Sequence, residues 1–207
     1  MTLLRLDHLA LSAETLAAGH AHAHAALGAP LAPRGEHPHM GTHNHLLSLG
    51  PQEYFEVIAI DPDATPPGRP RWFNIDNFSG PPRLTNWILA TDDMDVALAA
   101  LPSGFGTPIH LQRKDFRWQM AVPDDGILPW GGWGPAIIQW EGDLHPAPLL
   151  QDHNIRLRSL RIRHPQADDM AALLAPLLPT DTALFEPHDT PAIIAAFDTP
   201  DGIKHLQ

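Results

Sequence analysis

Cysteine is absent from this chain of 207 residues. Disulfide bonds, thiolate metal sites and a cysteine nucleophile are therefore excluded, and any metal must bind to histidine, carboxylate or amide oxygen ligands. A chain without disulfides fits a reducing compartment, and we expect a cytoplasmic location. Long apolar runs are also lacking, because Arg5 and Asp7 interrupt the first apolar stretch and no later run approaches the length of a membrane span. Neither a secretory leader nor a membrane partner is expected.

Basic residues are scarce. The 13 lysines and arginines are outnumbered by 24 aspartates and glutamates, which gives a formal net charge of −11. Binding to a polyanion requires a basic surface, so we expect a small-molecule partner rather than nucleic acid. The length suits one sizeable core or two small modules that share one. Twenty-three prolines and 15 glycines indicate many turns, and six tryptophans are enough to line a pocket.

Residues 37–62 form the most informative stretch, HPHMGTHNHLLSLGPQEYFEVIAIDP. Side chains alternate with a period of two over 43–49 and again over 54–60, which predicts two strands joined by a tight Gly-Pro turn. Glu56 lies in the middle of the second, otherwise apolar and aromatic strand. An ionised carboxylate in that position is costly unless it is paired, hydrogen-bonded or bound to a metal, so Glu56 requires a partner.

The segments around this stretch complete a module of strand, helix and three strands, residues 1–62. Residues 3–12 alternate as a strand with His8 near the middle, and a helix follows that we expect Ser12 to cap. A short irregular strand is predicted within 31–41.

A linker rich in proline and glycine, residues 61–82, marks a boundary between modules. Its Trp72 and Phe73 are expected to pack on the domain. Beyond it the order strand, helix, three strands repeats over 83–146, which we take as a second module.

Aligning the two copies pairs the polar residues of their strands. RLDHLALS over RLTNWILA places His8 over Asn86, and YFEVI over IIQWE places Glu56 over Gln139. His8 and Glu56 lie mid-strand at the beginning and end of the first module, where a curved sheet could bring them together. An imidazole and a carboxylate supply half of a nitrogen and oxygen metal site, suited to zinc, manganese, iron, nickel or magnesium. The alternative is a buried, hydrogen-bonded pair that only supports the sheet.

A partial third module is predicted over 154–207, again with a strand, a helix and further strands. It shows no histidine and carboxylate at matching positions. We therefore expect it to be structural, either extending the sheet or building a subunit contact as in a homodimer.

At this point the chain resembles the vicinal oxygen chelate superfamily, and within it the glyoxalase-like domain proteins. The resemblance lies in LDHLAL, in GTHN followed by YFEVIAIDP, in NWILATDD, in IIQWEG and in the terminal TPDG. It implies an α+β fold of tandem βαβββ modules, whose curved mixed sheets form a cleft, and we expect the partial third module to follow this pair. It also implies metal ligands on the first and last strands of each of the two full modules.

Carried over to this chain, the resemblance makes His8 and Glu56 the metal ligands of the first module. The matching positions of the second module hold Asn86 and Gln139. Amide oxygens are weak neutral ligands, so the site could be incomplete, could recruit His45 or His110, or could hold no metal.

Further candidates concern the substrate. Asn44 lies on the polar face of its strand, and Arg113 with Trp118 could hold a substrate carboxylate under an aromatic wall. Asn86 and Gln139 complete the set of predicted substrate-binding residues. The segment PWGGWGP, 129–135, could be a lid over a ligand or a packed aromatic turn.

Two functions remain open. The first is a divalent-metal-dependent lyase, isomerase or dioxygenase acting on a small oxygen-rich substrate, with Glu56 as ligand and proton carrier. The second is a small-molecule-binding protein of the same fold without chemistry, similar to drug-sequestering relatives. A phosphate-binding glycine loop, a GxSxG elbow and an HExxH motif are all absent from the sequence, which leaves other enzyme classes with little support.

Overall fold

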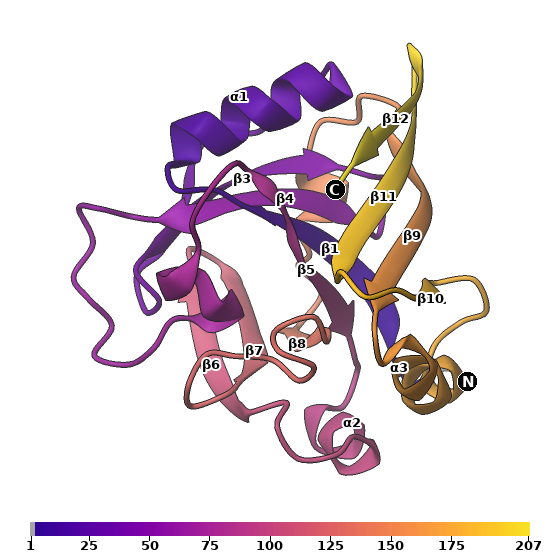
Figure 1. Cartoon of the computed structure of the whole chain (residues 1–207). Helices are drawn as coiled ribbons and strands as arrows, with labels where there is room; N and C mark the ends of the chain where they lie inside the picture. The colour runs from indigo at the N-terminus through magenta and orange to yellow at the C-terminus, as the bar shows by residue number, and fades with distance from the viewer. Residues whose placement is uncertain (1–2) are drawn as a thin grey trace.

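The computed structural model describes residues 3–207 and shows a protein of curved β-sheets with few helices (Figure 1). Met1 and Thr2, which open the predicted first module, lie outside the described residues. No helix within 3–207 combines the length and apolar character that a membrane crossing needs.

The first half of the chain forms a strand, a helix and three strands. These are β1 (Arg5–Ser12), α1 (Leu16–Leu27), β2 (Gly35–His37), β3 (Thr42–Ser48) and β4 (Tyr54–Ile60). Thr15 caps α1, since its hydroxyl accepts a hydrogen bond from the Ala18 amide at 3.2 Å. The expectation that Ser12 would be the cap is wrong, because Ser12 still belongs to β1 and its hydroxyl lies 2.7 Å from that of Thr85.

The second half repeats this order. Its elements are β5 (Arg83–Ala90), α2 (Met94–Ala100), β6 (Thr107–Arg113), β7 (Phe116–Val122) and β8 (Ala136–Glu141). Asp93 caps α2 by accepting a hydrogen bond from the Val96 amide at 3.0 Å.

Both halves contribute to a single eight-stranded sheet with the order β2-β3-β4-β1-β5-β8-β7-β6. Each half has its first strand parallel to its last, and β1 joins β5 in an antiparallel pair at the centre. The sheet curves so far that its two edge strands, β2 and β6, approach each other. The predicted α+β fold of tandem βαβββ units around a curved sheet is confirmed. The division into separate modules at 1–62, 83–146 and 154–207 stays a prediction.

The central β1–β5 pair contains two bulges. Leu6 pairs with Leu89 and His8 with Ile88, so Asp7 is an extra residue on β1. Thr85 is the corresponding extra residue on β5. A bulge turns the local side chains relative to the regular pleat, and here it does so within the strand that carries His8.

The last part of the chain builds a second sheet that packs on the first instead of extending it. Its elements are β9 (Arg156–His164), α3 (Ala167–Leu174), β10 (Leu184–Pro187), β11 (Ala192–Thr199) and β12 (Gly202–Leu206), in the strand order β10-β9-β11-β12. Phe197 of β11 meets Phe55 of β4 edge to face, with 6.1 Å between the ring centroids. Of the two alternatives for this part, extension of the main sheet is therefore wrong. The reason is that β9 and β11 carry an apolar face which covers the larger sheet.

Two apolar clusters lie on opposite faces of the main sheet. On the outer face, Leu9 and Trp87 pack with residues of the helices and the second sheet. On the inner face, Ile88 and Met120 pack with Trp72 of the linker. Trp72 and Phe73 belong to a 3-10 helix, η1 (Trp72–Asn77), and are 3% and 8% exposed, as predicted from the sequence. The linker thus fills much of the space enclosed by the inner face of the sheet and leaves room for only a small site.

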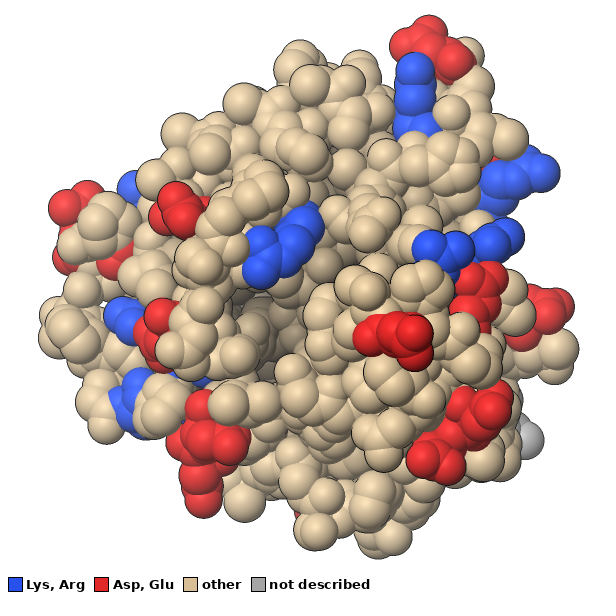
Figure 2. Space-filling model, in the orientation of Figure 1, with Lys and Arg blue, Asp and Glu red and all other residues tan. Residues whose placement is uncertain are grey.

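Charged side chains are dispersed over the face shown in Figure 2, and much of its central area consists of uncharged residues. The net charge of −11 is therefore not gathered into one acidic patch on this face.

Candidate functional site

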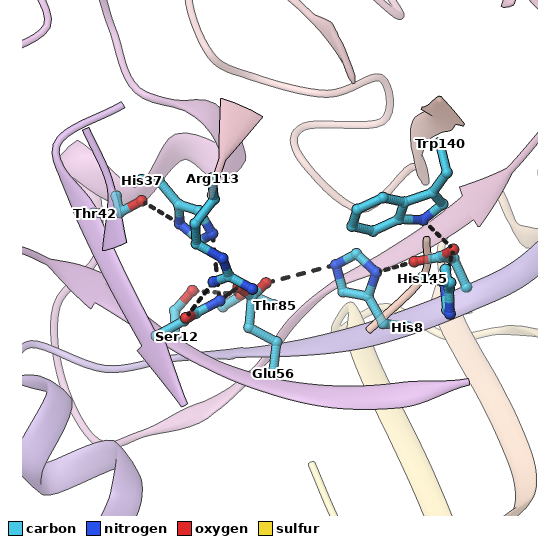
Figure 3. A network of polar contacts seen from close by, with 11 residues as sticks. His8, Ser12, His37, Thr42, Glu56, Thr85, Arg113, Trp140 and His145 are labelled. Atoms are coloured by element: carbon cyan, nitrogen blue, oxygen red, sulfur yellow. Dashed lines mark hydrogen bonds and ion pairs between the residues drawn. The ribbon is translucent and has the colours of Figure 1, made fainter. Parts of the chain in front are cut away.

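The imidazole of His8 lies between two carboxylates in the interior of the protein (Figure 3). Its Nδ1 is 2.6 Å from Oδ1 of Asp7, and its Nε2 is 3.6 Å from Oε2 of Glu56. The contact between His8 and Asp7 is a short, charge-assisted hydrogen bond. The second distance is longer than a hydrogen bond, so the Nε2 proton of His8 can still be donated to a ligand oxygen. His8 and Glu56 are brought together as the sequence predicted.

Asp7 was not among the residues predicted from the sequence. The bulge in β1 brings its side chain to the same group, where Oδ2 accepts hydrogen bonds from Trp140 Nε1 at 2.9 Å and from His145 Nε2 at 3.1 Å. Asp7 is 2% exposed. The available signal was an acidic residue inside an apolar strand, the same signal that identified Glu56.

On the other side of the site, Glu56 is held by Asn44 of the neighbouring strand. Asn44 Nδ2 donates to Oε1 of Glu56 at 2.6 Å and lies 3.3 Å from Nε2 of His37. Oδ1 of Asn44 accepts a hydrogen bond from Nη1 of Arg113 at 3.0 Å. Arg113 comes from β6, so this contact links the two edges of the curved sheet.

The protonation states follow from these contacts. Burial alone would lower the pKa of His8, but the hydrogen bond to Asp7 and the negative charges of Asp7 and Glu56 raise it to about 9. Burial alone would raise the pKa of Glu56, but His8 and the Asn44 hydrogen bond lower it to about 2. Burial also acts against ionisation of Asp7, yet hydrogen bonds from His145 and His8 hold its pKa well below the usual range. Near neutral pH the site therefore contains an imidazolium between two carboxylates.

His37 differs from His8, because burial lowers its pKa to about 4 and Glu56 offsets this only in part. It is therefore neutral near pH 7, with Nδ1 3.1 Å from the hydroxyl of Thr42. A neutral ring of this kind can accept or donate a hydrogen bond at Nε2.

Two cavities adjoin at this site. The inner pocket, about 30 Å³, is lined by His8, Glu56, His37, Asn44, Arg113 and Trp118, among others. It has room for roughly two water molecules. The outer groove, about 670 Å³, is lined by Arg34, Glu36, Lys114, Phe116, Leu149 and Leu150, among others. Asn44, Leu46 and Arg113 line both cavities, so they separate the groove from the carboxylate of Glu56.

Gln139, predicted to match Glu56, lies on the other side of its strand. Its Oε1 accepts from the Met94 amide at 2.8 Å, and its Nε2 donates to the Asp92 carbonyl at 3.2 Å, so it holds the start of α2. Ile138 packs in the inner cluster instead, and Trp140 lines the inner pocket. The alignment of the two copies misplaced this strand relative to the pleat, and a shift of one residue exchanges the two faces.

Asn86 pairs with Ala10, and Ala10 pairs in turn with Glu56, so the three residues form one row across the sheet. Oδ1 of Asn86 is buried without a hydrogen-bond partner among the described residues. Asn86 is not part of the lining of the inner pocket.

His45 and His110, the two histidines considered as additional metal ligands, both lie outside the inner pocket. His45 Nδ1 lies 2.7 Å from the Ala32 carbonyl, and its ring meets His20 of α1. His110 is exposed on β6 and pairs with Glu141 at 3.1 Å.

Of the two alternatives for residues 129–135, a lid or a packed aromatic turn, the structure shows the packed turn. Trp130 and Trp133 lie against the outer-face core, and the Trp133 carbonyl accepts a hydrogen bond from Trp87 Nε1 at 3.0 Å. Trp118, in contrast, is buried at the inner pocket, 5.5 Å from Trp140 between ring centroids. The aromatic wall of the site is therefore Trp118, as predicted, together with Trp140.

The residues present do not fit the four-ligand metal centre that the family resemblance implied. Within residues 3–207 no group of three or more histidine, aspartate or glutamate side chains is arranged to hold a metal ion. Of the four expected positions, His8 and Glu56 come together, whereas Gln139 is committed to the backbone of α2. Two protein ligands fall short of the three or four that metal sites of nitrogen and oxygen ligands normally use.

The sequence matches the family model of the glyoxalase-like domain over residues 6–178. The chain belongs to the glyoxalase-like domain family. The membership in the vicinal oxygen chelate superfamily that its motifs predicted is confirmed. The glyoxalase-like match covers the whole eight-stranded sheet from Leu6 onward and reaches into the second sheet. A search of curated proteins finds no significant match.

One solved structure supports the fold of this glyoxalase-like protein. A hypothetical protein from Staphylococcus aureus is 16% identical, with 98% of this chain and 85% of that chain covered and a TM-score of 0.57. Methylmalonyl-CoA epimerases from Streptomyces coelicolor and Mycobacterium tuberculosis are 16% and 17% identical. They cover 68% and 67% of this chain and 100% and 88% of their own, with TM-scores of 0.44 and 0.42. At 16% identity the likeness to the Staphylococcus aureus protein extends to the fold alone.

Proposed function

We propose that this protein is an enzyme that moves a proton on a small, oxygen-rich organic acid, as an isomerase or lyase does, with Glu56 as the base. The observation that carries the proposal is the buried imidazolium of His8 beside the carboxylate of Glu56, at the end of a groove large enough for a substrate. A buried acid and base with strongly shifted pKa values in a cavity are typical of active sites.

In the proposed step, Glu56 accepts a proton from a carbon next to a carbonyl group. The electron pair of that C–H bond forms a carbon–carbon double bond while the π pair of the carbonyl moves onto its oxygen, and the resulting enolate is stabilised by the Nε2–H of His8. Returning the proton to the opposite face of the same carbon inverts that carbon, as an isomerase does, and loss of a leaving group from the neighbouring carbon as a double bond forms gives a lyase. Asp7 keeps the proton on Nδ1 and orients the ring.

The low pKa of Glu56 matters for this step. It makes the free carboxylate a weak base, because His8 and Asn44 stabilise its charge. A substrate oxygen that takes the Nε2–H of His8 weakens one of these interactions and so raises the pKa of Glu56. The site thereby becomes more basic when a substrate is bound.

One observation favours a second function, that of a small-molecule-binding protein without chemistry. The inner pocket of about 30 Å³ admits only a few atoms, whereas the groove outside it, with a volume of about 670 Å³, is large enough for a whole small-molecule ligand. A ligand could bind in the groove without reaching Glu56.

Hydrogen exchange at carbon distinguishes the two functions. Parent protein is incubated in D₂O with a panel of 2-oxo acids and 3-oxo acids, and loss of the C–H signal is followed by NMR. We expect faster exchange for at least one acid, a decrease of about a hundredfold or more in Glu56→Gln, and no change in Glu186→Gln on the second sheet, away from both cavities. Saturable binding without exchange across the panel would leave the binding protein as the function.

Metal analysis accompanies this experiment, because the family resemblance predicted a divalent ion. Exchange activity and melting temperature are measured before and after treatment with a chelator. We expect both to persist, since only His8 and Glu56 of the four expected positions are placed for a metal. A stoichiometric ion whose removal lowers the melting temperature would contradict the metal-free form of the proposal.

We also infer a structural role for residues 154–207. Ile162 and Phe197 of this part are fully buried against the outer face of the main sheet, on the side away from the inner pocket.

A further inference from the structure

The feature of interest is the contact that closes the inner pocket from the groove. Arg113 reaches across from the edge strand β6 to Asn44 of β3, so its side chain passes over β2. Residue 35 on β2 is a glycine, and a Cβ at this position would overlap Nη1 of Arg113 and Oδ1 of Asn44. The φ angle of Gly35 is ordinary, so the glycine is required by the close approach of the arginine and not by the backbone.

The contact that holds Arg113 is a weak one for a guanidinium group. The guanidinium of Arg113 donates to a neutral amide oxygen, Oδ1 of Asn44, at 3.0 Å. Its Cζ atom lies 5.9 Å from the centre of the Phe116 ring. A carboxylate binds a guanidinium through two parallel, charge-assisted hydrogen bonds, which are roughly twice as strong as those to a neutral group. A ligand carboxylate in the groove therefore competes well against Asn44.

The remaining lining of the groove indicates the rest of the ligand. Lys114 adds a second positive charge beside Arg113, while Arg34 is already paired with Asp61 at 2.7 Å and Glu36 at 3.1 Å. Phe116, Leu149 and Leu150 supply an apolar wall. This combination of a cationic end and an apolar wall fits an organic anion with an apolar body.

We propose that the outer groove binds a carboxylate with an apolar body, and that its carboxylate draws Arg113 away from Asn44 and so opens the inner pocket. This inference rests on the proposed function in one respect, since it names the class of substrate that would reach Glu56. Arg113 is then a gate that responds to the charge of the ligand, and Gly35 is the residue that lets the gate close.

The binding part of the proposal is tested with octanoate, which has a carboxylate and an apolar chain but no ketone to activate a C–H bond. Calorimetry compares octanoate with octanol and octylamine on the parent protein. We expect octanoate to bind at least tenfold more tightly than either, because only octanoate can pair with Arg113. Equal binding of octanol, or no binding of octanoate at millimolar concentration, would overturn the assignment of the ligand class.

Variants then test which cation is responsible. Arg113→Gln is expected to weaken octanoate binding by tenfold or more, whereas Arg113→Lys retains part of it and Arg158→Gln, on the second sheet away from the groove, changes it by less than threefold. Octanol binding should be the same in all four proteins. An unchanged octanoate affinity in a folded Arg113→Gln protein would contradict the role of Arg113, and the comparison of ligands on the parent does not depend on any variant.

The gate itself is read from the side-chain amide of Asn44 by NMR. In the closed state Nδ2 of Asn44 is hydrogen-bonded to Glu56 and buried. We expect octanoate, but not octanol, to accelerate exchange of this amide with water severalfold. The side-chain amide of Asn77, which bonds to Asn74 in the linker, is the internal control. Binding without faster exchange at Asn44 would show a groove without a gate.

These results are independent of catalysis. Octanoate binding controlled by Arg113 can be found when no acid of the panel shows carbon exchange, and carbon exchange can be found when Arg113 has no effect. Failure of one proposal is therefore distinguished from failure of the other.

Discussion

Asp7 and His8 are consecutive residues whose side chains bond to each other, with 2.6 Å between Oδ1 and Nδ1. In a regular strand two successive side chains point to opposite faces of the sheet. The bulge at Asp7 removes this separation and gives His8 an anionic partner from its own strand. The imidazole is thereby held in one orientation before any ligand arrives.

Replacing Asp7 by Asn should destabilise the protein strongly. The change keeps the shape of the side chain but removes a charge that accepts hydrogen bonds from His8, Trp140 and His145. We expect the free energy of unfolding to fall by about 2 to 4 kcal/mol in urea titrations. Asp92→Asn is the control, because that side chain is 79% exposed and should contribute less than about 1 kcal/mol. Equal effects of the two changes would contradict the buried ionic cluster.

The stability of the protein should depend on pH with a sign set by each histidine. The pKa of His8 is raised from 6.5 to about 9, so its stabilising contribution is complete below pH 6.5 and is lost as the pH rises through 9. The pKa of His37 is lowered to about 4, so its contribution is complete above pH 6.5 and is lost as the pH falls through 4. Glu56, with a pKa lowered from 4.5 to about 2, loses its contribution only as the pH falls from 4.5 through 2.

These contributions together predict a maximum of stability near pH 6.5 from this group of residues. The alkaline loss between pH 6.5 and 9 should amount to about 3 kcal/mol. Urea unfolding at intervals from pH 5 to 9.5 measures it, and His8→Gln should remove the alkaline slope while His110→Gln leaves it unchanged. A parent profile that is flat above pH 6.5 would show that His8 is not protonated in the folded state.

Trp72 should be one of the most costly residues to truncate. It is 3% exposed in the inner cluster and comes from the linker, so Trp72→Ala leaves a large cavity inside the curved sheet. We expect a loss of about 3 to 5 kcal/mol in the free energy of unfolding. Trp72→Phe should cost much less, because the indole N–H that it removes has no hydrogen-bond partner among the described residues. Leu149→Ala, at a residue 65% exposed, should change the free energy by less than about 0.5 kcal/mol.

The architecture was largely predictable because it depends on the alternation of apolar and polar side chains within each strand and on the repeated order of strands and helices. The alternation around Glu56 gave the correct face of β4, since Phe55, Val57 and Ala59 pack on the outer face and Ile58 on the inner one. The repeated order of strand, helix and three strands gave the sheet of two similar halves.

The site was predictable only in part. His8, Glu56, Asn44, Arg113 and Trp118 meet around one pocket, and each was chosen for its residue type and its place on a strand. Asp7 and Gln139 were misjudged for a common reason. Their orientation depends on bulges and on the pairing of distant strands, and the alternation within a single segment contains no information about either.

The two bulges of the central strand pair also compensate for each other. Arg5 lies opposite Ala90 and Ser12 opposite Arg83, so eight residues face eight, and only the stretch between Asp7 and Thr85 is out of step by one residue. Deleting either residue alone would shift one half of the sheet against the other, whereas deleting both would restore an uninterrupted ladder. Deleting one of these two positions, which lie 78 apart in the chain, therefore requires deleting the other if both halves of the sheet are to keep their register.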